Sequence, residues 1–399
     1  MFKLIPSGTV TSTPGFLAGA VHAGIKSDNA PDLAILYSKV PCTAVGAFTT
    51  NRIKSAPVLL SQKRLSRGQA QAIVVNSGCA NACMGEQSLV DASEMAKLTA
   101  AKLDISPEDI LVASTGVIGM PLPMKQIRDG IEKVGLHPDG GHDFAKAIMT
   151  TDTKPKEVAV QVDMRELKFT IAGVAKGAGM IHPNLATMLC FIATDASLDA
   201  AFLQSSLQKA MEISFNMISV DGDTSPSDSV FLLANGLAGN KAIGFDNGKV
   251  FQETLNEVCS YLARAIVQDG EGATKFIEVT VERAKNPSEA CQASRTIASS
   301  LSVKTAIHGS DPNWGRIIAA LGRSGVEIVE EKIDLYLNDV CVLRKGIPLP
   351  FDRDGLRTTL SHNDNALIRI CLNLGDGKAT AWGCDLSEEY VTINSEHTT

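Results

Sequence analysis

Apolar runs and helix-like apolar spacings alternate along this chain. Residues 72–75 form a continuous apolar run that ends at the turn signal Asn76-Ser77-Gly78, which predicts a buried strand. Over 91–103, Met95, Leu98 and Leu103 lie near one face of a predicted helix. The same patterns predict strands at 110–113, 167–174, 187–194, 277–283 and 366–373, helices at 199–215, 251–268 and 290–301, and a hairpin over 332–342.

The order of these elements predicts the fold class. Strands and helices are mixed along the chain without a regular strand–helix–strand repeat, which indicates an α/β (α+β) fold with helices layered on mixed sheets. Between two predicted strands lies Lys176-Gly177-Ala178-Gly179, where the glycines are incompatible with regular structure. We therefore expect an irregular loop that enters a strand at Thr187.

The composition argues against several classes of protein. A chain of 399 residues, 44% of them hydrophobic, can bury a substantial core, and its net charge of −7 argues against nucleic-acid or anionic-membrane partners. No apolar stretch approaches the roughly 20 residues of a membrane-spanning helix. Nine scattered cysteines are not a disulfide scaffold, so we expect free thiols and a cytoplasmic location. A zinc site at Cys79 and Cys83 is the less favoured alternative.

Thr187 is the candidate nucleophile. A threonine that opens a strand is ordinarily just a β-branched residue suited to the sheet, and this interpretation stays open from the residues alone. As a nucleophile, its hydroxyl needs a base, and its own α-amine can serve once the chain is cut before it. An α-amine has a pKa of about 7.7–8, so much of it is unprotonated near neutrality. A cut between Ala186 and Thr187 supplies both groups on one residue.

The run from Lys176 to Leu189, which ends in Ala186-Thr187-Met188-Leu189, resembles the self-cleaving signature of the ArgJ family. This is the family of glutamate N-acetyltransferases, or ornithine acetyltransferases. Other motifs match the same family in order, at 76–78, 114–119, 150–153, 219–224, 269–275, 311–316 and 390–399. The resemblance thus extends almost from end to end, and it implies an N-terminal-nucleophile-like αββα arrangement of the ArgJ/DmpA type.

The resemblance also implies an acyltransferase of arginine biosynthesis. Self-cleavage would give an alpha chain, 1–186, and a beta chain, 187–399, which assemble as a heterotetramer of two copies of each. N2-acetyl-L-ornithine would donate its acetyl group to Thr187, and L-glutamate would accept it. Some members also use acetyl-CoA as donor, and the sequence does not decide this point. No metal or organic cofactor is implied.

Site residues follow from the matching motifs. The resemblance makes Thr187 the nucleophile, Thr115 and Gly116 the oxyanion hole, and Thr150, Lys176, Thr187, Glu271, Asn394 and Thr399 the substrate-binding residues. Lys176 can bind a carboxylate, whereas Glu271 or the Thr399 carboxylate can bind an ammonium group. Thr151 and Thr153 stand beside Thr150 and are alternatives to it. A functional C-terminus requires that Asn394 anchor the tail, because chain ends normally fray.

Rival interpretations remain at this stage. One is an N-terminal-nucleophile amidohydrolase or aminopeptidase, in which water replaces glutamate as acceptor, and another is a non-catalytic binding protein of the same fold. His182 is either a general base or, as we favour, a residue that shapes the loop. The chain departs from the family pattern at Cys79, Met84 and Pro226-Ser227, where asparagine, threonine and threonine-asparagine are expected. These positions bear on donor choice or loop packing.

Overall fold

The computed structural model describes residues 2–164, 167–182 and 188–396. Within these residues the larger sheet has nine strands, in the order β1–β6–β7–β8–β10–β3–β4–β5, with β2 paired to β3. Their bounds are β1 Phe2–Leu4, β2 Phe16–Val21, β3 Leu33–Phe48, β4 Gln69–Asn76, β5 Ile110–Ser114, β6 Lys156–Met164, β7 Leu167–Lys176, β8 Leu189–Thr194 and β10 Ser229–Ala234. Most pairs are antiparallel, but β8–β10 and β4–β5 are parallel, so the sheet is mixed.

The larger sheet folds back on itself at β3. The first part of this strand pairs with β2 and β4, and its last part pairs with β10, with a register shift between Tyr37 and Cys42. Side chains alternate between faces accordingly. Ile73 of β4 and Phe191 of β8 belong to one shared core, whereas their neighbours Val74 and Ile192 belong to two other cores. The two halves of the sheet are therefore two layers with a common interior.

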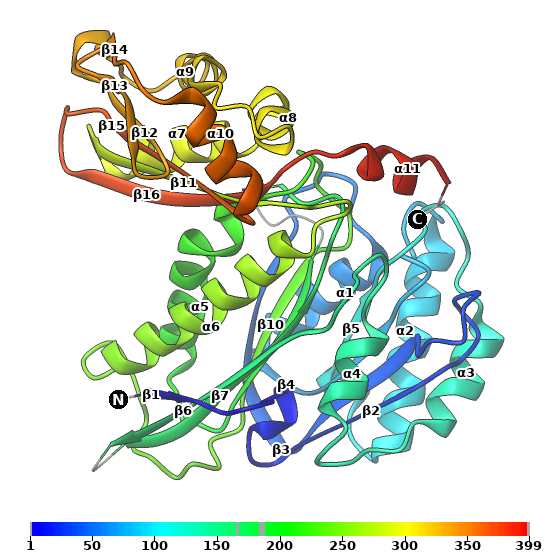
Figure 1. Ribbon diagram of the computed structural model, residues 1–399. Coiled ribbons are helices and arrows are strands. Elements are labelled where there is room, and N and C mark those ends of the chain that lie inside the picture. The colour runs from blue at the N-terminus through cyan, green and yellow to red at the C-terminus, as the bar shows by residue number, and fades with distance from the viewer. Residues whose placement is uncertain (1, 165–166, 183–187, 397–399) are drawn as a thin grey trace.

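Helices cover the outer face of each layer, as Figure 1 shows. Helices α2 (Glu86–Leu103) and α3 (Met124–Lys133) pack on the half with β4 and β5, and α1 (Ala56–Leu65) lies beside them. Helices α5 (Ala200–Ile213) and α6 (Lys249–Gln268) pack on the half with β6, β7, β8 and β10. The order helix, sheet, sheet, helix is the αββα arrangement, and the predicted class of mixed sheets layered with helices is confirmed.

A second, mixed sheet lies in the lobe at the top left of Figure 1. Its order is β14–β13–β12–β15–β11–β16–β9, with bounds β9 Ile218–Ser219, β11 Phe276–Ala284, β12 Asp334–Leu337, β13 Val340–Arg344, β14 Ile347–Pro348, β15 Asn365–Cys371 and β16 Gly377–Cys384. The remaining helices are α4 Gly141–Ala147, α7 Pro287–Ala298, α8 Leu301–His308, α9 Trp314–Gly322, α10 Arg353–His362 and α11 Glu388–Glu396. In the part of the chain that the structure describes, no helix is both long and apolar enough to cross a bilayer.

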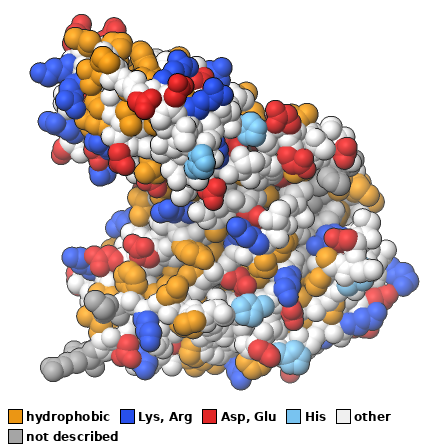
Figure 2. All heavy atoms as spheres, in the orientation of Figure 1, with side chains coloured by type: hydrophobic (Ala, Val, Ile, Leu, Met, Phe, Trp, Pro, Cys, Tyr) orange, Lys and Arg blue, Asp and Glu red, His pale blue; other side chains and the backbone are white. Residues whose placement is uncertain are grey.

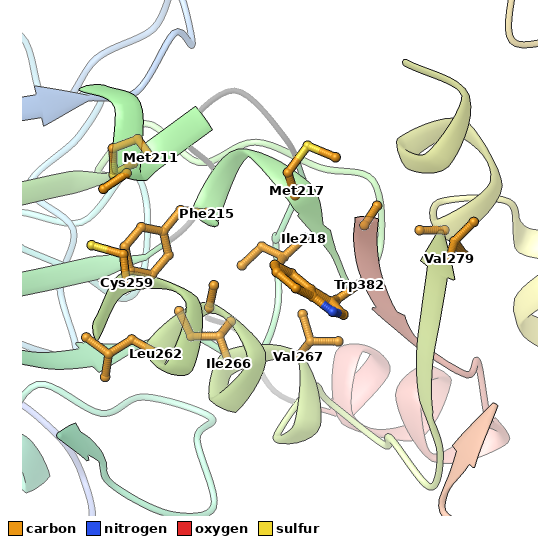
Figure 3. Packing of buried hydrophobic residues seen from close by; sticks show 14 of the residues in the cluster. Met211, Phe215, Met217, Ile218, Cys259, Leu262, Ile266, Val267, Val279 and Trp382 are labelled. Carbon is orange, nitrogen blue, oxygen red and sulfur yellow. The ribbon is translucent and has the colours of Figure 1, made fainter. Parts of the chain in front are cut away.

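One hydrophobic core joins the lobe to the larger sheet. Phe215 and Cys259, near α5 and in α6, belong to the same buried cluster as Ile218 of β9 and Trp382 of β16, and Figure 3 shows these side chains facing one another. Figure 2 shows one face of both parts, on which acidic and basic side chains of the described residues lie among one another. The segments that connect the two parts are packed against this shared core. The site lies among these segments.

Most elements predicted from the pattern are confirmed. The runs at 72–75, 110–113, 167–174 and 277–283 lie in β4, β5, β7 and β11, and the run at 366–373 overlaps β15, which ends two residues earlier at Cys371. The helices at 91–103, 199–215 and 251–268 correspond to α2, which begins five residues earlier at Glu86, and to α5 and α6, and the hairpin over 332–342 is β12–β13. The helix predicted over 290–301 is wrong at its end. It stops at Ala298, and Ser300 precedes a new helix at Leu301, because serine favours helix ends over helix interiors. The strand predicted over 187–194 begins at Leu189 as β8, with Met188 before it, and Thr187 lies outside the described residues.

Candidate active site

The loop between β7 and β8 carries the predicted cleavage site. Lys176, the last residue of β7, pairs with Leu189, the first residue of β8, so the intervening segment leaves and re-enters the sheet at one point. Ala186 and Thr187 lie outside the described residues, as does Thr399. The structure describes the chain up to His182 and again from Met188 onward.

The six predicted site residues that the structure describes line one cavity of about 50 Å³. They are Thr115, Gly116, Thr150, Lys176, Glu271 and Asn394. They come from the end of β5, the loop after α4, the end of β7, the loop after α6, and α11. Other residues that line the cavity are Ala80, Ile118, Thr151, Gly179, Met180, Ser225 and Ser227. Five segments far apart in sequence therefore converge on a small, mainly polar space.

Lys176 is the buried cation of this cavity. Its Nζ donates to Thr150 Oγ1 at 2.7 Å and to Thr115 Oγ1 at 3.4 Å. Burial lowers the pKa of its ammonium group, against the charge of Asp152, which raises it. Among the described residues no carboxylate forms an ion pair with Lys176, so its charge is available to an anionic group in the cavity.

Thr115 and Gly116 stand on a rigid turn after β5. Gly116 has φ +122°, and a Cβ there would lie 2.4 Å from the carbonyl carbon of Gly78, so only glycine fits. The Thr115 N–H donates to Asn76 O at 3.1 Å. The Gly116 N–H has no acceptor among the residues that the structure describes. Thr115, which has a hydroxyl, and Gly116, which carries this N–H, both line the cavity, and donors of this kind are what an oxyanion hole requires.

Asp152 supports two site residues and escaped the sequence analysis as a functional residue. One carboxylate oxygen accepts from Lys156 Nζ at 2.5 Å and from Gly177 N at 2.7 Å, and the other accepts from Thr150 N at 3.0 Å. Burial raises the pKa of Asp152, but the charges of Lys176 and Lys156 outweigh it and lower the pKa to about 2. The carboxylate is therefore ionised, and it fixes the backbone at Thr150 and at Gly177, the residue after Lys176. Its place in the matched motif at 150–153 was the available signal.

The neighbouring threonines differ in position. Thr150 and Thr151 both line the cavity, and Thr150 bonds to Lys176. Thr153 instead donates from its backbone and its hydroxyl to Asp269, and Asp269 accepts from Lys156 Nζ at 2.6 Å. Thr153 therefore belongs to the buried polar contacts beneath the site. Its partner Asp269 lies two residues before Glu271 in the sequence.

Glu271 and Asn394 connect helix α11 to the loop between β7 and β8. Asn394 Nδ2 donates to Glu271 Oε2 at 2.8 Å, and the Glu271 N–H donates to Ala178 O at 3.0 Å. A Cβ at Gly179 would lie 2.4 Å from Glu271 Oε1, so glycine lets the carboxylate approach the loop. The Asn394–Glu271 bond attaches α11 to the site, and Thr399 lies outside the described residues.

Two carboxylates, half-buried Asp221 and buried Asp228, hold the chain on either side of 183–187. Asp221 accepts from the N–H groups of Met180 and Ile181 at 2.6 and 3.0 Å. Asp228 accepts from the Met188 N–H at 3.0 Å. Burial raises the pKa of both carboxyl groups. Both were missed as loop-holding residues, since the sequence pattern indicates only a bend at 221–223.

His182 does not line the cavity. Its Nδ1 lies 3.2 Å from Ser219 Oγ, burial lowers its pKa, and it lines a separate hollow with Gln292 and Arg295. This placement favours the interpretation as a loop-shaping residue. Cys79 lies behind the oxyanion turn, where its buried thiol donates to Met120 O at 3.4 Å. All nine cysteines are free thiols.

Comparison with known proteins identifies the family. The profile of the ArgJ family matches residues 17–399. The chain belongs to the ArgJ family. It is 53% identical over 400 aligned positions to "Arginine biosynthesis bifunctional protein ArgJ" of Dehalococcoides mccartyi, with 99% of this chain and 98% of that protein covered. The protein of the same name from Symbiobacterium thermophilum is 49% identical, with 98% and 99% covered.

A solved ArgJ structure matches part of the fold. The crystal structure of "Arginine biosynthesis bifunctional protein argJ" from Bacillus halodurans is 42% identical with a TM-score of 0.51, and the match covers 52% of this chain and 98% of that one. These findings confirm the resemblance seen in the sequence. The ArgJ chain described here is an acyltransferase of arginine biosynthesis with an α/β fold.

Proposed function

We propose that this ArgJ chain cuts itself between Ala186 and Thr187 and then moves an acetyl group from N2-acetyl-L-ornithine to L-glutamate through an acetyl-Thr187 intermediate. The observation that carries the proposal is the convergence of Thr115, Gly116 and four other predicted residues on one cavity beside the loop with Thr187. Such a convergence is required of an active site and is not expected of unrelated surface residues.

Self-cleavage uses the hydroxyl of Thr187 against the carbonyl carbon of Ala186. The bond from that carbon to the Thr187 nitrogen breaks, water releases the acyl group, and the α-amine of Thr187 becomes free. The carboxylates of Asp221 and Asp228 support the step because they hold both flanks of the segment. The Bacillus halodurans chain is in keeping with a cut, because it matches 52% of this chain over 98% of its own length. The 213 residues of 187–399 are about 53% of 399.

In the transfer reaction, Thr187 Oγ attacks the acetyl carbonyl of the donor and gives its proton to the Thr187 α-amine. The negative charge on the carbonyl oxygen is met by Thr115 and Gly116, each donor being worth roughly 100- to 1,000-fold in rate. The bond from the carbonyl to nitrogen breaks, and the leaving amine of ornithine takes the proton. The free amine of glutamate then attacks the acetyl ester, which regenerates the Thr187 hydroxyl.

Different polar residues of the cavity bind the differently charged groups of the amino-acid substrates. Lys176, with Thr150 beside it, faces the α-carboxylate, whereas Glu271 faces a substrate ammonium group. Asn394 holds the Glu271 carboxylate in place. The Thr399 carboxylate is a second partner for an ammonium group in this proposal.

Further parts of the proposal concern donor, assembly and location. The word "bifunctional" in the names of the Dehalococcoides mccartyi and Symbiobacterium thermophilum relatives favours acetyl-CoA as a second donor for this chain. The 1–186 and 187–399 chains remain together and form a heterotetramer of two copies of each in the cytoplasm. Glutamate acetylation with acetyl-CoA as the only donor tests the second activity.

The central test is the state of the chain around Thr187. Intact mass spectrometry of fresh protein should show two chains, and Thr187→Ala should leave one species of about 42.2 kDa. Thr187→Ser should retain partial cleavage and transfer because a hydroxyl remains. Two chains from Thr187→Ala would contradict the mechanism. Release of ornithine from N-acetylornithine without glutamate, at the full rate, would favour the amidohydrolase rival, and an intact wild-type chain would favour the non-catalytic one.

A further inference from the structure

A second, wider cavity adjoins the smaller one. Its volume is about 660 Å³, and it shares Gly116, Thr150 and Thr151 with the smaller cavity. The other residues that line it are Ile25, Lys26, Ser27, Asp28, Gly78, Val117, Met120, Ile393 and Glu396. We call this space the outer cavity. A ligand whose acetyl group reaches Gly116 therefore lies where both cavities can receive its remaining atoms.

Lys26 is the cation of the outer cavity, and its stem lies against the oxyanion turn. A Cβ at Gly78 would lie 2.9 Å from Lys26 Cγ, and a Cβ at Gly116 would lie 2.7 Å from Gly78 Cα. The three residues are therefore stacked in contact. The Lys26 ammonium donates to Met149 O at 3.2 Å, next to Thr150, which is bonded to Lys176. The ammonium groups of Lys26 and Lys176 therefore hydrogen-bond to two adjacent residues of one loop, Met149 and Thr150.

The loop with Lys26 is built to hold its position. The carboxylate of Asp32, which is fully buried, accepts hydrogen bonds from the backbone N–H groups of four successive residues, 23–26, at 2.6 to 3.1 Å. The Asp32 carbonyl accepts from the Ser77 N–H at 2.9 Å. This arrangement fixes the Lys26 backbone to the turn before Gly78. A loop restrained in this way presents its side chain at low entropic cost.

We propose that the outer cavity receives the side chain of the amino-acid acceptor and that Lys26 binds its carboxylate. This inference rests on the proposed function, in which the acceptor is glutamate, a dicarboxylate. Within residues 2–164, 167–182 and 188–396, neither Lys176 nor Lys26 has an ion-pair partner. Two cations without carboxylate partners, one in each cavity, suit a ligand with one carboxylate at each end.

The same cavity explains how one site accepts two oppositely charged side chains. Asp28 and Glu396 line the outer cavity together with Lys26. Glu271 in the smaller cavity and these two carboxylates are the acceptors for the ammonium group of the ornithine side chain, and the carboxylate of the glutamate side chain finds Lys26. The acidic residues also oppose a ligand with several negative charges, so we assign Lys26 to a carboxylate and not to the phosphates of acetyl-CoA.

The test compares Lys26→Met with wild type in the two half-reactions. We expect the KM for glutamate to rise at least about tenfold, because a charge-assisted hydrogen bond is lost. The KM for N-acetylornithine should not rise, because its side chain is cationic. Lys26→Arg should restore much of the glutamate KM. Lys249→Met is the matched control, since Lys249 is an exposed lysine at the start of α6, and it should behave as wild type.

Glutamine as acceptor separates the proposal from a structural role of Lys26. Glutamine lacks the side-chain charge, so Lys26→Met should bring the KM values for glutamate and glutamine together. Equal increases for both acceptors would overturn the proposal, as would a raised KM for acetyl-CoA with an unchanged KM for glutamate. Formation of acetyl-enzyme from N-acetylornithine by wild type tests the proposed function separately. If that acetyl-enzyme is absent, the proposed function fails whatever Lys26→Met does.

Discussion

At the scale of single residues, the site depends on positions where only one residue type fits. Gly116 combines φ +122° with a contact to the Gly78 backbone that leaves no room for a Cβ. Gly119, three residues later on the same turn, also has a positive φ, +79°, but a Cβ there meets no atom within 4 Å. Alanine substitutions at the two glycines therefore distinguish the effect of backbone strain from the effect of displacing the proposed oxyanion donors.

This difference gives a prediction with a built-in control. Gly116→Ala should lower kcat for acetyl transfer by at least about 100-fold, because the added Cβ displaces the donor N–H. Gly119→Ala should cost about 1–2 kcal/mol of stability from its left-handed backbone and keep kcat within a few-fold. Steady-state kinetics and thermal unfolding measure the two effects. A wild-type kcat in Gly116→Ala would remove this turn from the mechanism.

At the scale of elements, α11 is the tether between the second lobe and the catalytic cavity. Tyr390 OH donates to Asp221 Oδ2 at 3.3 Å, and Ser387 Oγ donates to Gly272 O at 2.6 Å. With the Asn394–Glu271 bond, these contacts attach α11 and the residue before it along the segment 387–396. Since α11 buries no residue of its own, these polar bonds help to hold its position.

Loss of the last attachment should weaken substrate binding. We expect Asn394→Ala to raise the KM for N-acetylornithine about tenfold, because the Glu271 carboxylate loses a partner. Asn394→Asp should be worse, since two carboxylates then face each other. Ser395→Ala is the control on the same helix, because Ser395 bonds only to Thr392 O among the described residues. An Asn394→Ala enzyme with the KM of this control would show that α11 is not part of the site.

At the scale of the whole molecule, the two expected chains share one sheet. Strands β8 and β10, which follow residue 187, lie between β7 and β3, which precede it. The β7–β8 and β10–β3 pairs each have six residues in register. Strands of the 1–186 and 187–399 segments therefore alternate within one sheet, so the two segments form one body and not separate domains.

Interleaving predicts that cleavage leaves a single particle. The cleaved enzyme and uncleaved Thr187→Ala should elute together in size-exclusion chromatography, because separation would expose the shared sheet and core to water. Denaturant should separate the two chains of the wild type only. Free 1–186 and 187–399 chains under native conditions would contradict this architecture.

The sequence by itself determined the family, the strand and helix pattern, and the residue types of the reaction. Local signals were sufficient where an element carries its own apolar period, as in α2 and β4. They failed where the pattern is set by distant partners, as in β3, whose 16 residues pair with three other strands across a bend.

Only the tertiary structure decided which side chains meet. Lys26 and Asp228 carry no local signal, and the roles of Lys26, Asp152 and Asp228 arise from contacts with groups distant in sequence: Met149 O, Gly177 N and Met188 N. A buried charge or an unpaired cation acquires its function from the dielectric and the partners around it. Those surroundings exist only after the strands have paired and the loops have come together.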